Sequence, residues 1–174
     1  MTPRGGAPYP RGGVGEPKIQ NRVERIEVHV CVGEARMAAT DDPIFLGIRG
    51  PGGREFRLQR AEGASFRRGA DDRYVLAGAD DDATNVDHAE LNDPTAPARD
   101  AARIESCYVR KGAEPIPNVR GIGELDDRVE IVEVEITVHA AGQAEPLRFA
   151  RQGPIWLGLA CGSTLEVPRE DDAA

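Results

Sequence analysis

The sequence has few aromatic residues and no long apolar segment. Phe, Tyr and Trp together make up 5% of its 174 residues, and there is a single Trp. A hydrophobic core must therefore be built from Val, Ile, Leu and Ala. No stretch approaches the roughly 20 apolar residues of a membrane-spanning helix, so we do not expect an integral membrane protein. The length suits one domain with tails.

The sequence also lacks an excess of basic residues. Its 22 Lys and Arg stand against 30 Asp and Glu, which gives a formal net charge of −8. Such a surface repels a phosphate backbone and gains little from counterion release, so we exclude nucleic acid as a partner. Residues 1–18 contain no apolar run of the kind found in a signal peptide. We therefore expect a cytoplasmic protein.

Spacings typical of metal and redox sites are missing as well. The three cysteines, Cys31, Cys107 and Cys161, form no Cys-x-x-Cys pair, and each lies in or beside an apolar run. We interpret them as reduced thiols with a structural role. The histidines show neither His-x-His nor His-x-x-x-His spacing, so a histidine metal site would have to be assembled by folding. His29 lies on the side of its predicted strand opposite to the apolar residues.

What the sequence does contain is apolar alternation with a period of two. In residues 22–32, Ile26, Val28, Val30 and Val32 alternate with polar side chains, and the same holds for Val132, Val134, Ile136 and Val138. This pattern is typical of half-buried strands. Apolar runs separated mostly by turn residues predict strands in eight segments: 22–32, 43–49, 54–59, 73–77, 103–110, 129–138, 147–150 and 154–160.

No window keeps a helical period for three turns, so the class is all-β. The residues Gly50-Pro51-Gly52-Gly53 predict a hairpin between the second and third strands. Many short strands with regular turns indicate an antiparallel β-sandwich of about eight strands. We expect a single domain over residues 22–168, which includes a long acidic surface loop at 78–101 with Leu91 as its apolar anchor. Residues 1–21 are expected to be a disordered tail, and residues 169–174 an acidic, frayed one.

Two parts of the sequence repeat. Arg22–Val32 matches Arg128–Val138 at six of eleven positions, and Pro43–Ile48 matches Pro154–Leu159 at four of six. We interpret this as two hairpins of one design. They arose by duplication, by loss of most of a second domain, or by convergence on one pattern. The second copy is too short for a core of its own and must pack against the first.

Two motifs carry a family resemblance. Ala39-Thr40-Asp41-Asp42 follows the first strand, and Phe66-Arg67-Arg68-Gly69-Ala70-Asp71-Asp72-Arg73-Tyr74 reads Phe-x-x-Gly-x-x-Asp-x-Tyr. In this order they resemble the PLAT domain, the β-sandwich module named for polycystin, lipoxygenase and alpha-toxin. Weaker similarity continues through residues 103–110, 125–130 and 149–156. The resemblance implies a non-catalytic binding module that docks onto a lipid surface or a protein partner.

The resemblance also bears on calcium. Of the family's calcium residues only Thr40 and Asp41 carry over, and Lys111 stands where the family has an acidic residue. Calcium needs six to eight oxygen ligands, which acidic pairs on neighbouring loops can supply. The candidate metal residues are therefore Thr40, Asp41 and Asp42, with a solvated acidic rim as the alternative. We expect no obligatory cofactor, with Ca²⁺ as the open possibility.

A basic cluster and a possible nucleophile complete the candidates. Arginines gather around the third and fourth strands, and those proposed to bind are Arg54, Arg57, Arg67 and Arg68. A basic patch there fits an anionic lipid surface or an acidic protein, whereas pairing with nearby acids is the alternative. A hydrolase would need Ser163 or Cys161 with His139, but no Gly-x-Ser-x-Gly elbow is present. We expect no enzyme, and we place Trp156 in the core.

Overall fold

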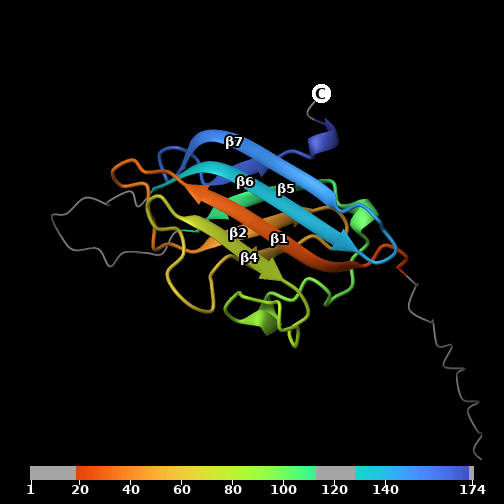
Figure 1. The fold of residues 1–174 in the computed structure, drawn as a ribbon. Helices are drawn as coiled ribbons and strands as arrows, with labels where there is room; N and C mark the ends of the chain where they lie inside the picture. The colour runs from red at the N-terminus through yellow and green to blue at the C-terminus, as the bar shows by residue number, and fades with distance from the viewer. Residues whose placement is uncertain (1–18, 113–127, 173–174) are drawn as a thin grey trace, which may run out of the picture.

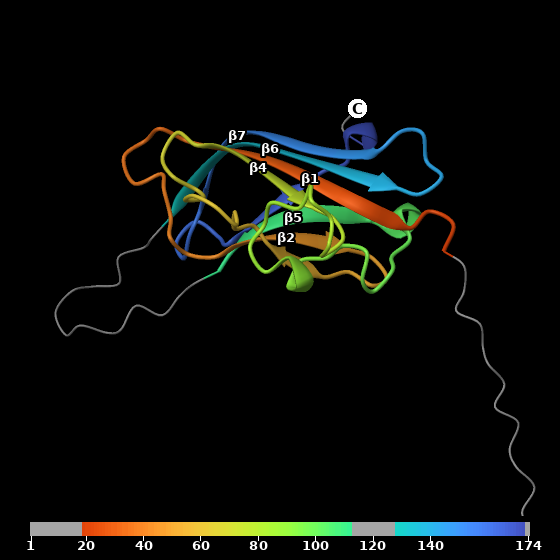
Figure 2. The same ribbon diagram turned by 60° about the horizontal axis from the view of Figure 1, so that its bottom comes forward.

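The computed structural model describes residues 19–112 and 128–172, and these form two stacked antiparallel sheets (Figures 1 and 2). The first sheet has the strand order β4-β1-β6-β7, and the second has the order β3-β2-β5-β8. The strands are β1 (Val23–Val32), β2 (Ile44–Arg49), β3 (Glu55–Arg57), β4 (Asp71–Leu76), β5 (Ser106–Lys111), β6 (Val129–Ala140), β7 (Leu147–Leu157) and β8 (Thr164–Val167). The predicted all-β antiparallel sandwich is confirmed.

The core lies between the sheets and is aliphatic. In β1 the four alternating residues Ile26, Val28, Val30 and Val32 are all buried. They belong to one continuous cluster that draws side chains from both sheets. Burying one Val, Leu or Ile contributes about 1.5–3 kcal/mol, so many small side chains replace the aromatic residues that the sequence lacks. Trp156 differs from expectation, because it is only partly buried and Arg128 lies over its ring, 4.6 Å from the centroid.

The first repeat has a simple structural meaning. β1 and β6 are antiparallel neighbours, with Val28 opposite Ile136 and Val30 opposite Val134. The second repeat has no structural counterpart. Residues 44–48 lie in β2 of the second sheet, whereas residues 154–157 are the last four residues of β7 in the first sheet. The interpretation of two equivalent hairpins is therefore wrong. β6 and β7 form a hairpin, but the chain crosses from one sheet to the other between β1 and β2.

The strand count of eight agrees with the prediction, but the strands differ. Residues 147–150 and 154–160 were expected to be separate strands, and instead residues 147–157 form β7. Gly153, with φ of +110°, and Pro154 stand opposite Val132 alone as a bulge in this edge strand. Val132 is 39% exposed rather than in the core, because it is also an extra residue of β6 against β1, where Cys31 stands opposite Glu133 and Val32 opposite Ile131. The unpredicted strand β8 brings the total back to eight; its four residues alternate, with Leu165 and Val167 buried, but the alternation is too short to have identified it.

The long loop at 78–101 is held to the sandwich by polar contacts. Val86 and Ala101 are buried apolar residues of the loop, at 3% and 0% exposure, whereas the expected anchor Leu91 is 65% exposed. The loop contains a 3₁₀ turn at Ala89–Leu91, and a second one at Ala101–Arg103 follows it. The Arg54 guanidinium donates to the carbonyl oxygens of residues 91, 93 and 96. Arg54 therefore organises this loop.

The predicted boundaries hold to within one residue for β1 and β2, whereas β3 ends two residues earlier than expected and β6 two residues later. β4 begins two residues earlier than expected, and residues 103–105 precede β5 rather than opening it. The hairpin at residues 50–53 is confirmed by the pairing of β2 with β3. Residues 170–172 form a 3₁₀ turn where a frayed tail was expected. The predicted disorder of the first residues and the family resemblance at 125–127 lie outside the described residues.

Candidate functional site

Three connections gather at one end of the sandwich, and we call them the loop end: residues 33–43, 58–70 and 158–163. They follow β1, β3 and β7 and include the orange and yellow loops at the left of Figure 1. Backbone hydrogen bonds join them. Gly69 N–H donates to Gly33 O at 2.9 Å, and Lys111 N–H donates to Ser163 O at 2.8 Å. Sequence positions far apart are thereby placed on one surface.

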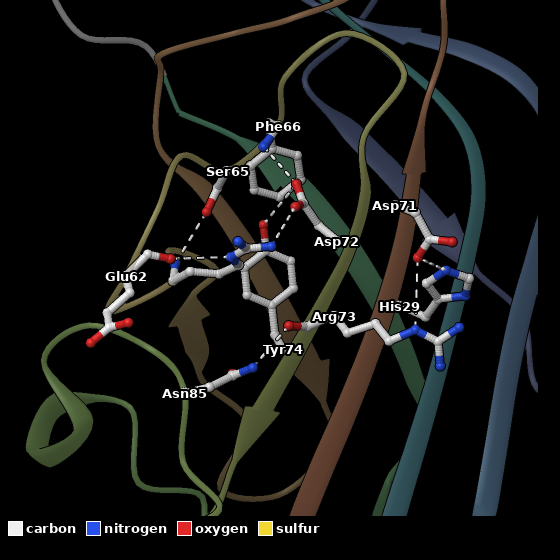
Figure 3. A network of polar contacts seen from close by, with 10 residues as sticks. His29, Glu62, Ser65, Phe66, Asp71, Asp72, Arg73, Tyr74 and Asn85 are labelled. Carbon is white, nitrogen blue, oxygen red and sulfur yellow. Dashed lines mark hydrogen bonds and ion pairs between the residues drawn. The ribbon is translucent and has the colours of Figure 1, made fainter.

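The Phe-x-x-Gly-x-x-Asp-x-Tyr motif braces the loop end (Figure 3). The Asp72 carboxylate is 2% exposed, and it accepts hydrogen bonds from the Phe66 backbone N–H at 2.7 Å and from the Tyr74 hydroxyl at 3.4 Å. Arg60 lies 3.3 Å from its other oxygen. The Phe66 ring stacks on Tyr74 with 5.7 Å between centroids, and burial raises the Tyr74 pKa. Gly69, at φ of +67°, permits the turn between Phe66 and Asp72.

The candidate calcium residues lie together, but a lysine lies among them. Thr40 is 4% exposed, and its hydroxyl accepts a hydrogen bond from the Asp42 N–H at 3.1 Å. The Asp42 carboxylate accepts a hydrogen bond from the Lys111 ammonium, and the side chains of the pair are 15% and 5% exposed. Asp41 pairs with Arg67 at 3.0 Å. Both carboxylates of the candidate site therefore already have a protein cation beside them.

The four candidate arginines do not act as one group. Arg54 lies near the Ile48 end of β2, where the Ile48 N–H donates to its carbonyl at 3.0 Å. Arg67 pairs with Asp41, before β2 begins. Arg57 is half-buried, and its backbone N–H donates to Asn92. Arg54 and Arg57 thus make hydrogen bonds to the loop at 78–101. Arg67 and Arg68 lie elsewhere, in the loop end.

Two exposed apolar side chains in the loop end were missed by sequence reasoning. Met37, at φ of +68°, is 53% exposed, and Leu159 is 70% exposed. Arg36, next to Met37, and Arg68, in the neighbouring connection at 58–70, are both exposed. No local signal marked them: Met37 stands between Arg36 and Ala38, and Leu159 falls within residues 154–160, for which the apolar pattern predicts a strand.

The outer face of the second sheet carries a separate polar network. Arg110 donates two hydrogen bonds of 2.6 Å to Glu55, and the Tyr108 hydroxyl donates a third at 3.1 Å. The hydrogen bonds from Arg110 hold the Glu55 pKa below its usual value. The Tyr108 ring lies over Gly47, where a Cβ atom would come within 1.9 Å of the ring. This network orders a sheet face and joins β3 to β5.

The residues of the hydrolase hypothesis are far apart. Cys161 and Ser163 lie in the loop end, just after β7. His139 lies near the opposite end of β6, where it stands opposite Arg25, while Val129 of β6 stands opposite Leu157. Ten residues of extended strand separate His139 from Val129, or roughly 30 Å. That catalytic set is not assembled, and the hypothesis built on it is wrong.

Comparison with known proteins gives structural matches without a sequence family. No family model matches the chain, and no curated protein matches it in sequence. The alpha-toxin of an avian strain of Clostridium perfringens matches with a TM-score of 0.53 at 15% identity, covering 88% of this chain and 34% of the toxin. Clostridium absonum alpha-toxin gives 0.52 at 14% identity, with 89% and 34% covered. Coral 8R-lipoxygenase gives 0.50 at 16% identity, with 83% and 17% covered.

The chain has a PLAT-like fold. Alpha-toxin and lipoxygenase are two of the three proteins for which the PLAT family is named, so the resemblance inferred from the Phe66–Tyr74 motif is confirmed for the fold. The chain spans about a third of the alpha-toxins that it matches and a smaller part of the lipoxygenase. The coral enzyme is described as activated by calcium through a C2-like domain. No helix in the described part of this PLAT-like chain could cross a membrane.

Proposed function

We propose that this PLAT-like chain is a non-catalytic binding module that docks onto an anionic lipid surface with its loop end. The observation that carries the proposal is the pairing of apolar and basic groups there. Met37 and Leu159 are exposed. Arg36 stands beside Met37 in the first connection, and Arg68 lies in the neighbouring connection at 58–70. Apolar tips that enter the headgroup region, flanked by arginines that meet anionic headgroups, are the usual combination for peripheral docking.

Charge fixes the orientation of docking. The chain carries a net charge of −8, so most of its surface is repelled by anionic lipid. The loop end carries as many basic as acidic residues, with Arg36, Arg60, Arg67 and Arg68 against Glu34, Asp41, Asp42 and Glu62. It is therefore repelled less than the rest of the surface, and its exposed Arg36 and Arg68 can meet anionic headgroups. Because the arginines are exposed, the electrostatic part of the binding is expected to weaken as salt screens it over a Debye length of about 10 Å at 0.1 M.

The structural matches support a binding role. The chain corresponds to part of two alpha-toxins and of a lipoxygenase that is described as regulated through its C2-like domain. The chain has this fold, and the residues considered for catalysis, Cys161, Ser163 and His139, are not brought together. Both observations fit a module that attaches a protein to the surface on which it acts. A protein partner at the same loops is the competing interpretation.

The test is co-sedimentation of the full chain with vesicles of phosphatidylcholine alone or mixed with phosphatidylserine. We expect pelleting with the mixed vesicles, and we expect it to fall with added salt. Met37→Asp and Arg68→Glu should each reduce it. The matched controls are Leu91→Asp and Arg148→Glu, which change exposed residues away from the loop end and should bind like the original chain.

Two results would overturn lipid docking. Absence of pelleting with either vesicle would leave the protein partner as the remaining binding role. Equal losses in the loop-end variants and the matched controls would mean that general surface charge, rather than the loop end, governs pelleting.

A further inference from the structure

We propose that His29, Cys31, Asp71 and Glu133 form a zinc-binding site on the outer face of the first sheet. The site is independent of the loop end and of lipid docking. His29 and Cys31 come from β1, Asp71 begins β4, and Glu133 comes from β6. Three neighbouring strands thus supply one nitrogen, one sulfur and two carboxylates, which is a donor set suited to zinc.

The strand register brings these residues together. Cys31 stands opposite Asp71 on one side and opposite Glu133 on the other. His29 is two residues before Cys31, so both side chains leave the same face of β1. Sheet pairing of backbone groups therefore fixes the cluster, and no mobile loop is needed to assemble it.

Three of the four ligand atoms already lie at separations close to those around a zinc ion, and the fourth residue, Glu133, lies near the sulfur atom. His29 Nε2, Cys31 Sγ and an Asp71 oxygen all lie within 4.8 Å of one another. Tetrahedral zinc, with Zn–N of about 2.0 Å and Zn–S of about 2.3 Å, separates nitrogen from sulfur by about 3.5 Å and sulfur from oxygen by about 3.6 Å. Cys31 Sγ is 3.5 Å from His29 Nε2 and 3.8 Å from Glu133 Oε2.

One pair has to open slightly. His29 Nε2 is 2.7 Å from Asp71 Oδ1, which is a direct hydrogen bond (Figure 3), whereas zinc would hold the two atoms about 3.4 Å apart. The Asp71 side chain is 63% exposed, so a small rotation supplies the difference. Arg73 Nε lies 3.7 Å from the same oxygen, and its side chain is 73% exposed and can turn towards solvent.

A supporting carboxylate stands behind the imidazole. Glu135 Oε2 lies 3.7 Å from His29 Nδ1, on the side of the ring away from the ligand cluster. A zinc-bound histidine ordinarily donates its second N–H to a carboxylate or carbonyl, which fixes the ring. Glu135 would therefore be a positioning residue for His29. Gln152 donates to Glu133 Oε1 at 3.0 Å and leaves Oε2 facing Cys31.

The same residues do not form a nucleophilic triad. In such a triad the thiol and the carboxylate bind different nitrogens of the imidazole. Here Cys31 Sγ and Asp71 Oδ1 both approach Nε2. Glu135 is the carboxylate on the Nδ1 side, but at 3.7 Å it is beyond hydrogen-bonding distance of that nitrogen. Convergence of the Cys31 and Asp71 atoms on Nε2 fits a common central ion.

Charge also favours a cation. The carboxylates of Asp71, Glu133 and Glu135 all lie around the Cys31 and His29 side chains. These carboxylates disfavour a thiolate on its own, and a divalent ion would compensate for the accumulated negative charge. Binding would release the thiol proton to solvent as the Zn–S bond forms.

The test is titration of the reduced full chain with Zn²⁺, followed by calorimetry, and with Co²⁺, followed by the thiolate-to-metal absorption band. We expect one equivalent to bind, with a cobalt band and a higher melting midpoint. Cys31→Ser should abolish the band. His29→Ala should weaken zinc binding at least tenfold. The milder substitutions Asp71→Asn and Glu135→Gln should weaken it by up to about 100-fold.

Matched controls separate this site from adventitious binding. Cys161→Ser removes the exposed thiol, and His88→Gln removes an exposed histidine that has Asp87 and Glu90 nearby. Both should bind zinc like the original chain. The site residues point out of the core, so circular dichroism and metal-free melting should be nearly unchanged in Cys31→Ser.

The proposal fails if the chain binds no zinc, or if Cys31→Ser and His29→Ala bind it unchanged. It also fails if Cys161→Ser alone removes the cobalt band. Destabilisation of metal-free His29→Ala with zinc affinity retained would make the cluster an ordinary set of cross-strand polar contacts. None of these results depends on vesicle binding, so the two proposals stand or fall separately.

Discussion

The Asp72 carboxylate accepts a hydrogen bond from the backbone N–H of Phe66, with 2.7 Å between Oδ2 and N. This contact joins β4 to the loop that precedes it, and it explains why an Asp stands six residues after a Phe in this fold. The acceptor is buried, so water cannot replace it. The position of the 58–70 loop therefore depends on one charged side chain.

Replacing Asp72 should destabilise the protein. Asp72→Asn weakens the acceptor for Phe66 and removes the charge that faces Arg60, and a hydrogen bond to a charged group contributes about 1.5–3 kcal/mol. We expect the free energy of unfolding in urea to fall by about that amount. Asp80→Asn, an exposed acid in the 78–101 loop, should change it by less than about 0.5 kcal/mol. Equal effects of the two substitutions would contradict a bracing role for Asp72.

The Glu55–Arg110 pair should make stability depend on pH in the acid range. Hydrogen bonds from Arg110 lower the folded-state pKa of Glu55 below its usual value of 4.5. The stabilisation is therefore complete above the unfolded-state pKa and is lost as the pH falls through the lower, folded-state pKa. We expect Arg110→Met to lose about 0.5–1 kcal/mol near neutral pH, since the pair is about one-third exposed.

The measurement is urea unfolding between about pH 6 and about pH 3. The variant Glu55→Gln should show a flatter pH dependence than the original chain, while Glu145→Gln, at an exposed position, should keep the original slope. If Glu55→Gln leaves the slope unchanged, the pair contributes nothing to acid unfolding.

The three thiols should differ in reactivity. Burial raises the Cys107 pKa to about 12, whereas Cys161 is exposed. The thiolate is the reacting form, so alkylation of the folded protein followed by mass spectrometry should modify Cys161 first and Cys107 only on unfolding. Cys31, partly buried among carboxylates, should react more slowly than Cys161. Early modification of Cys107 would show that the core opens readily.

Lys111 should make docking independent of calcium. Its ammonium lies against the Asp42 carboxylate, so a cation already occupies part of the candidate site. We expect calcium to leave the melting midpoint of the original chain unchanged, because a ligand that binds the native state would raise it. Lys111→Gln frees Asp42 from this partner and is the variant most suited to gain a calcium response. A calcium-induced rise in the original chain would overturn this prediction.

Sequence reasoning reached the sandwich through a local signal. The alternation in residues 26–32 indicates which side chains face inwards, because successive side chains of a strand point to opposite faces. This holds whichever strands lie beside it. The same holds for the Gly-rich hairpin at 50–53, since positive φ angles restrict the residue type. The motif from Phe66 to Tyr74 was visible too, although its cause, a hydrogen bond of Asp72, was not.

The errors share a different cause. Residues 151–153 are expected to separate two strands, the second of which begins at Pro154. In the structure Gly153 and Pro154 instead form a bulge within one edge strand, because no further strand needs the missing proline N–H. Leu91 was taken as an anchor because it is apolar, yet Val86 is buried and Arg54 holds the loop. Burial of a loop residue depends on where the loop lies against the sheets.

The sequence by itself determined the strand class, the inward residues of β1 and the lean aliphatic core, since period and composition act between near neighbours in the chain. Only the tertiary structure decided that His29 and Cys31 stand beside Asp71, that Lys111 pairs with Asp42, and that Met37 and Leu159 share one end. These juxtapositions depend on strand order and register, which arise from backbone pairing between distant segments and are not encoded in local periodicity.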